Sequence, residues 1–113
     1  MKEIKAYMRP HKLSDVTLAL YKVEGLTGVS VMDVRGCGRM IEKDDQLNVD
    51  EAVMDYEPHI KIEIVCSDEL VGEIVAAIQA SAHTGLRGDG KIYVSTVDDA
   101  IRISTGERGE EAV

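Results

Sequence analysis

Four segments of the chain alternate between apolar and polar residues, and two others repeat apolar residues at helical spacing. The alternating segments are Lys2–Arg9, Val29–Arg35, His59–Cys66 and Ile92–Thr96. A period of two predicts strands that bury one face. The helical segments lie between the first and second strands and between the third and fourth. This order, β-α-β-β-α-β, predicts an α+β fold, a ferredoxin-like sandwich whose single domain covers residues 1–113.

The ends of the helical segments carry signals of their own. Ser14 and Ser67 are the expected N-cap residues, because a serine hydroxyl can accept a backbone N–H that the first helical turn leaves unpaired. Gly25 is expected to end the first helix. After the last strand, Ile101–Ser104 is expected to form a short extended piece.

The second face of the predicted sheet needs a partner. Two helices can cover only one face of a four-stranded sheet. The strands also carry apolar residues on the other side, for example Val65. We therefore expect a homo-oligomer with the sheets packed together inside. Loops of neighbouring subunits would meet there, which is a natural place for a ligand site.

The composition argues against several kinds of partner and location. The chain of 113 residues has a formal net charge of −8, which argues against nucleic acid. No apolar run approaches the length of a membrane span, and the first residues contain no apolar core of a signal peptide. A cytoplasmic protein without membrane insertion is therefore expected. Cys37 and Cys66 lack metal-ligand spacing, and two free thiols are expected rather than a disulfide.

The stretch Thr84–Lys91 has three glycines in six residues, between a helical segment and a strand. Glycines permit positive φ and close backbone approach, so several N–H groups can point at one anion. Arg87 and Lys91 add positive charge. These residues favour an anion-binding loop for phosphate, but a flexible turn is an equally good interpretation of the stretch alone.

The segment from residue 40 to residue 58 has no clean period. Between Glu42 and Glu57 it contains seven acidic residues and one lysine. The acidic side chains could hold a cation, although their spacing is not that of an EF-hand. A solvated loop that becomes ordered on a protein partner is the preferred interpretation.

Several motifs occur in a fixed order along the whole chain. They are Arg9-Pro10-His11-Lys12-Leu13, Gly36-Cys37-Gly38-Arg39, Lys61-Ile62-Glu63-Ile64-Val65, Thr84-Gly85-x-x-Gly88-Asp89-Gly90-Lys91-Ile92 and Thr105-Gly106-Glu107-Arg108-Gly109. In this order and at this spacing the chain resembles the PII signal-transduction family, as a divergent PII-like member. The glycine-rich stretch and the Thr-Gly-Glu-Arg-Gly stretch are the most specific parts of the resemblance.

The resemblance implies a homotrimer that binds ATP or ADP in clefts between subunits. It implies a T-loop at about residues 38–58, which docks into a transporter or enzyme, a B-loop at 84–91 and a C-terminal loop at 102–113. The residues that it implies for nucleotide binding are Gly28, Ser30, Gly36, Cys37, Gly38, Arg39, Thr84, Gly85, Arg87, Gly88, Asp89, Gly90, Lys91 and Arg102.

The sequence departs from the family pattern at a few positions. Met40 and His59 replace the glutamine and lysine that serve Mg²⁺ and 2-oxoglutarate in classical members, so these two residues mark a second-effector site whose ligand could be bicarbonate instead. Leu86 and Ser104 replace cationic residues, which gives ADP and AMP more weight relative to ATP. Ala52 stands in the place of the modified tyrosine, so uridylylation there is excluded.

The predicted function is that of a non-enzymatic regulator of nitrogen or inorganic-carbon metabolism. No nucleophile-base pair accompanies the cations, so binding rather than turnover is expected. No covalent cofactor and no dedicated metal site are predicted. The alternative is a CutA-like trimer on the same scaffold, acting as a metal-binding or structural protein.

Overall fold

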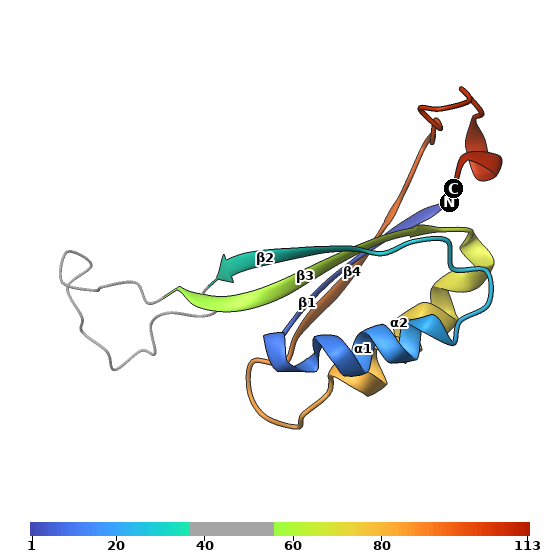
Figure 1. The fold of residues 1–113 in the computed structure, drawn as a ribbon. Coiled ribbons are helices and arrows are strands. Elements are labelled where there is room, and N and C mark those ends of the chain that lie inside the picture. Colours follow the sequence, from blue (N-terminus) through green and yellow to red (C-terminus); the bar gives the residue numbers. More distant parts are fainter. Residues whose placement is uncertain (37–55) are drawn as a thin grey trace.

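The computed structural model describes residues 1–36 and 56–113 and contains the predicted order of elements (Figure 1). The strands are β1 (Lys2–Met8), β2 (Ser30–Gly36), β3 (Glu57–Cys66) and β4 (Gly90–Thr96). The helices are α1 (Leu13–Tyr21) and α2 (Val71–Ala82), with short 3₁₀ helices η1 (Pro10–Lys12), η2 (Asp68–Leu70) and η3 (Gly109–Ala112). The prediction of an α+β ferredoxin-like fold is confirmed.

The four strands form one antiparallel sheet in the order β2-β3-β1-β4. The register places Ile4 opposite Ile64 on one side and opposite Val94 on the other. Both helices lie on the same face of this sheet (Figure 1). The first strand is therefore central, and the chain must return to it twice to complete the sheet.

The core lies between the helices and the sheet. It consists of aliphatic and sulfur-containing side chains, namely Ile4, Ala6, Met8, Val16, Leu20, Val23, Ile60, Ile62, Ile64, Cys66, Ile74, Ile78 and Ala82. Each fully buried isoleucine contributes about 1.5–3 kcal/mol relative to an exposed one. Cys66 lies on the buried face of β3 and belongs to this core. Its burial raises the pKa of the thiol.

The face of the sheet away from the helices is more polar than Val65 alone suggests. The Nζ atom of Lys61 lies 2.8 Å from a carboxylate oxygen of Glu63, and Lys5 lies 3.2 Å from Glu3. The hydrogen bond between Lys61 and Glu63 raises the pKa of the lysine and lowers that of the glutamate. The Lys61 ammonium also lies 5.8 Å from the centre of the Tyr7 ring. This face therefore carries pairs of oppositely charged side chains along β1 and β3.

The helix starts differ from their prediction. Ser14 lies inside α1, because η1 leads directly into the helix and Lys12 occupies the N-cap. Ser67 precedes η2 rather than α2, and its side chain makes no capping hydrogen bond. At the other end, Gly25 lies beyond the end of α1, in the connecting turn with φ of +87°.

The C-terminal segment, residues 98–113, turns back on itself, although a short extended piece was predicted at Ile101–Ser104. Ile101 forms an isolated antiparallel bridge with Arg108. The Arg102 N–H donates to the Glu107 carbonyl at 2.9 Å, and the Gly106 N–H returns to the Arg102 carbonyl at 2.7 Å. These local hydrogen bonds outweigh the alternating pattern and close a tight turn.

No helix within the described ranges 1–36 and 56–113 has both the length and the apolar character needed to cross a membrane.

Candidate functional site

The glycine-rich loop joins α2 to β4 and lies against the end of β1. Gly85, Gly88 and Gly90 all have positive φ, at +83°, +92° and +109°. At Gly90 the need for glycine is absolute, because an added Cβ would lie 1.8 Å from the carbonyl oxygen of Tyr7. Where the loop enters β4, its backbone therefore lies so close to β1 that only glycine fits at position 90.

The Asp89 carboxylate joins the two ends of this loop. One oxygen accepts the Thr84 N–H at 2.8 Å and the Gly85 N–H at 3.2 Å. The other accepts the Thr84 hydroxyl and, at 3.3 Å, the Arg9 Nε–H. The hydrogen bonds from Thr84 are the main reason why the pKa of Asp89 lies well below its ordinary value. The ring Nδ1 of His83 lies 3.5 Å from the same carboxylate.

Two further contacts complete the loop. The Leu86 N–H donates to the Thr84 hydroxyl oxygen at 3.1 Å, and the Arg9 guanidinium donates to the carbonyl of Arg87. The N–H groups of residues 84–86 are thus already bonded within the loop. An incoming anion would meet the later part of the loop and the side chains beside it.

Beside the loop lies a pocket of about 670 Å³, which we call the cationic pocket. Its lining comes from β1, β2, β3, β4 and the loop, and consists of Tyr7, Arg9, Val34, Arg35, Gly36, Glu57, His59, Arg87, Gly88, Asp89, Gly90, Lys91 and Tyr93. Four of these residues carry a permanent positive charge and two are acidic. Its size lies in the range of small-molecule sites.

The structure brings together most of the predicted site residues from the loop and the end of β2. Gly36, His59, Arg87, Gly88, Asp89, Gly90 and Lys91 all line the cationic pocket. The Nδ1 atom of His59 lies 3.1 Å from the Glu57 carbonyl oxygen. Cys37, Gly38, Arg39 and Met40 lie outside the described residues, as does almost all of the predicted T-loop.

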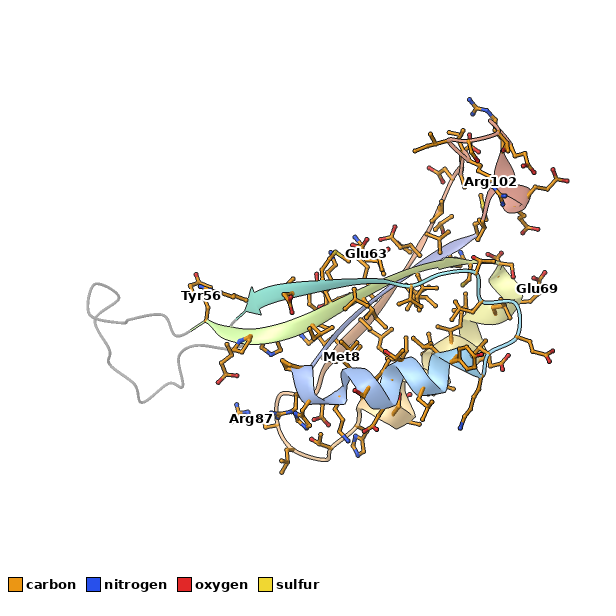
Figure 2. All side chains as sticks on the ribbon, in the orientation of Figure 1. Met8, Tyr56, Glu63, Glu69, Arg87 and Arg102 are labelled. Carbon is orange, nitrogen blue, oxygen red and sulfur yellow. The ribbon has the colours of Figure 1, made fainter. Side chains whose placement is uncertain are left out.

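Thr84 and Gly85 bond to Asp89 within the loop and do not line the pocket, and three further predicted residues lie away from the loop. Arg102 belongs to the C-terminal segment, at the opposite end of the sheet from Arg87 (Figure 2). Gly28 and Ser30 lie at the start of β2, which is ~20 Å from Gly36 by the rise of an extended strand. Gly28 lines a separate apolar groove between α1 and β2. A single chain therefore does not unite all the predicted residues.

Six pocket residues escaped the prediction of site residues, namely Tyr7, Arg9, Val34, Arg35, Glu57 and Tyr93. The arginines each follow or end a predicted strand, and strands of one sheet that end at the same edge bring such residues together. Tyr7 pairs with Lys91 across β1 and β4, and its ring meets Tyr93 edge to face at 6.1 Å. The register of the strands, which periodicity does not give, was the missing information.

The described residues contain no cluster of three or more histidine, cysteine, aspartate or glutamate side chains arranged to hold a metal ion. The acidic segment between Glu42 and Glu57 lies almost entirely outside the described residues.

The family model of the nitrogen regulatory protein P-II matches residues 1–107. This chain belongs to the nitrogen regulatory protein P-II family. The predicted resemblance is thereby confirmed, and the P-II match decides against the CutA-like alternative.

Individual P-II relatives match over the full length. The chain is 43% identical to nitrogen regulatory protein P-II of Azospirillum brasilense and 44% identical to that of Rhodospirillum rubrum, each over 100% of both chains. Among solved structures, Arabidopsis thaliana PII bound to citrate superposes with a TM-score of 0.80 at 38% identity, covering 99% of this chain and 91% of that one.

Membership of the P-II family settles the class of function. P-II proteins are signal-transduction regulators and not enzymes, which confirms the predicted non-enzymatic regulator. Proteins of the family are trimeric, bind small ligands and act on partner proteins. The cationic pocket, at the end of the sheet that carries the P-II glycine loop, is the candidate ligand site of this member.

Proposed function

We propose that this P-II protein binds ADP or ATP, with AMP as a third candidate, in clefts between the subunits of a homotrimer. The nucleotide would then set the conformation of the T-loop at about residues 38–58, through which the protein regulates a partner. The observation that carries this proposal is the cationic pocket beside the glycine loop.

The charges of the pocket suit a phosphate chain. The whole protein has a formal net charge of −8, yet four cationic side chains gather here with two acidic ones. Arg9 is already paired with Asp89. Neither the side chain of Arg35 nor that of Lys91 has a hydrogen-bond or ion-pair partner within the part of the chain that the structure describes. Both can therefore bind phosphate through charge-assisted hydrogen bonds.

The separation of Arg102 from the pocket supports a site shared between subunits. Its guanidinium donates to the Glu111 carbonyl at 3.1 Å and is otherwise exposed at the far end of the sheet (Figure 2). A neighbouring subunit in a trimer could supply Arg102, Gly28 and Ser30 to the pocket of the first. This arrangement would unite all the predicted residues.

A second effector remains part of the proposal. His59 lines the cationic pocket, so a small anion such as bicarbonate bound there would lie beside the nucleotide. The predicted partner of His59 in this role is Met40, and Mg²⁺ could bind with the phosphates. A neutral imidazole is a weaker anion partner than an ammonium group, which argues against 2-oxoglutarate.

Isothermal titration calorimetry of the purified protein with ADP, ATP and AMP tests the proposal. We expect saturable binding at sub-millimolar concentration, one nucleotide per subunit. The titrations should be repeated with Mg²⁺, bicarbonate and 2-oxoglutarate. The proposal fails if none of the three nucleotides binds.

A mixing experiment tests whether the site is shared. Lys91→Ala and Arg102→Ala should each weaken nucleotide binding in a trimer of identical subunits. When the two variants are unfolded together and refolded as mixed trimers, the intact Lys91 of one subunit should meet the intact Arg102 of another and restore tight sites. If mixing restores no tight binding, the site does not lie between subunits.

The partner would be recognised by charge. The acidic stretch from Glu42 to Glu57 suits a basic surface on a transporter or enzyme of nitrogen or inorganic-carbon metabolism. A cytoplasmic location is part of this proposal, and fractionation of cells that make the protein would test it.

A further inference from the structure

We propose that Asp89 is a positioning residue, whose carboxylate shapes the glycine loop for ligand binding and does not itself contact the ligand. This inference rests on the proposed nucleotide site for its functional consequence. It assigns to Asp89 a role different from that of Lys91, although both belong to the same predicted nucleotide-binding motif.

The carboxylate of Asp89 has no remaining capacity for a ligand. An ionised carboxylate accepts about four hydrogen bonds. Here one oxygen accepts from the backbone of Thr84 and Gly85, and the other from the Thr84 hydroxyl and the Arg9 guanidinium. His83 approaches the same group at 3.5 Å. A phosphate or a nucleotide hydroxyl would have to displace one of these contacts.

The contacts of Asp89 determine where the rest of the loop lies. They tie the first residues of the loop to the last one before β4. Through Arg9, which also donates to the Arg87 carbonyl, they tie the loop to the end of β1. An added Cβ at Gly88 would lie 3.3 Å from the Arg9 Nη2 atom, so the loop fits closely around this guanidinium. The positions of Arg87 and Lys91 in the pocket follow from this frame.

The negative charge of Asp89 makes it possible to distinguish a positioning role from a direct electrostatic effect on the ligand. Asp89 is a negative group in a pocket that would take an anion. Replacing it with a neutral residue should strengthen nucleotide binding if only charge mattered. A positioning role predicts the opposite, because Asn keeps one acceptor oxygen and places an NH2 donor where the second oxygen accepted two hydrogen bonds, so the loop would lose its shape.

The test compares Asp89→Asn with Asp98→Asn. Asp98 is exposed beyond the end of β4, so the control removes the same charge outside the pocket. In the ligand-free proteins, hydrogen exchange should show the amides of Thr84, Gly85 and Leu86 opening at least about tenfold faster in Asp89→Asn, with the core strands unchanged. ADP binding by calorimetry should weaken about tenfold or more, as expected when charge-assisted contacts are lost.

A third readout is the salt dependence of ADP binding. Because Asp89→Asn keeps every cation and removes only a charge that repels the nucleotide, the salt dependence of ADP binding should be at least as steep as in the native protein, whereas Lys91→Ala should make it shallower. Unchanged or tighter ADP binding by Asp89→Asn would overturn the inference, as would unchanged exchange of the three loop amides.

Thr84→Val provides a second variant in case Asp89→Asn does not fold. It keeps every charge and removes the hydroxyl that donates to Asp89 and accepts from Leu86. The same two changes, faster exchange of the loop amides and weaker ADP binding, are expected in smaller degree. Normal exchange and affinity in this variant would overturn the inference.

The exchange experiment also separates this inference from the proposed function. If the native protein binds no adenine nucleotide, the proposed function and the functional half of the inference both fail. Exchange in the ligand-free variants would still support or overturn the role of Asp89 in shaping the loop.

Discussion

The loop at residues 84–91 and the C-terminal segment at residues 98–113 lie at opposite ends of the same strand, β4, and are built in different ways (Figure 1). The loop is tied to a distant part of the chain, since Arg9 bonds to Asp89 and Gly90 lies against Tyr7. The C-terminal segment is held mostly by local contacts, such as the ion pair between Arg108 and Asp99 at 2.7 Å.

The two regions also differ in what they leave exposed. The loop and the strand ends around it present cations in a formed pocket. The C-terminal segment presents two apolar side chains, with Ile103 fully exposed and Ile101 about half exposed. The loop therefore takes its shape within one chain, whereas the C-terminal segment has an apolar surface that nothing in the described ranges 1–36 and 56–113 covers.

The largest expected difference between the regions lies in their glycines. Gly90→Ala should lower the free energy of unfolding by about 3 kcal/mol or more, because its Cβ would collide with the Tyr7 backbone. Gly106→Ala should cost roughly 1–2 kcal/mol, since φ is +75° but nothing lies within 4 Å. Urea denaturation measures both values. Equal losses would show that the loop is no more closely packed than the C-terminal turn.

Lys91→Ala tests the function of the loop side. Loss of a charge-assisted contact to phosphate should weaken ADP binding by roughly 1.5–3 kcal/mol without changing the unfolding midpoint. Lys22→Ala, an exposed lysine after α1, is the matched control and should bind ADP normally. Calorimetry on the three proteins makes the comparison. A normal affinity for the Lys91 variant would remove the loop from the ligand site.

Ile103→Ser tests the C-terminal side. If this side chain is covered by another subunit, its loss should weaken self-association by roughly 1.5–3 kcal/mol per subunit, the value for burying one large aliphatic residue. Leu18→Ser, on the exposed surface of α1, serves as the control. Sedimentation over a range of concentrations gives the result. An oligomer equally strong in both variants would mean that Ile103 stays exposed.

The smallest expected effect is the response of the Asp89 carboxylate to low pH. The pKa of Asp89 is lowered in the folded protein, so the stabilisation by its carboxylate is complete above the ordinary aspartate pKa of about 3.9 and is lost only as pH falls through the lower folded value. The carboxyl carbon signal of Asp89 should therefore not titrate between about pH 6 and pH 3 in an NMR experiment. A midpoint near the ordinary value would contradict the hydrogen-bonded geometry of the loop.

Much of the fold could be predicted because the signals were periodic. The alternation of Ile60, Ile62 and Ile64 is a local property of the sequence, and it identified β3 and its buried face correctly. The helix starts were missed because Pro10 and Asp68 begin 3₁₀ turns that lead into the helices, so the serines were not needed as caps. The C-terminal turn was missed because hydrogen bonds between Arg102 and Gly106 outweigh an alternating pattern of only four residues.

The site was predicted only in part, for a related reason. The glycine loop could be found because its residues are adjacent in sequence. Arg9 and Arg35 join it only through the pairing of β1 with β3 and β4 and of β2 with β3. The role of Asp89 depends on five contacts to four residues, and nothing in a motif distinguishes such a contact from one with a ligand.

The central position of β1 has a consequence for how the protein is made. This strand leaves the ribosome before both of its neighbours, β3 and β4, which end at residues 66 and 96. Until those residues emerge, Ile4, Ala6 and Met8 have no strands to pair with and their apolar side chains stay accessible to chaperones. Folding must close long chain loops before the core forms, which predicts slower folding than for a helical bundle of equal length.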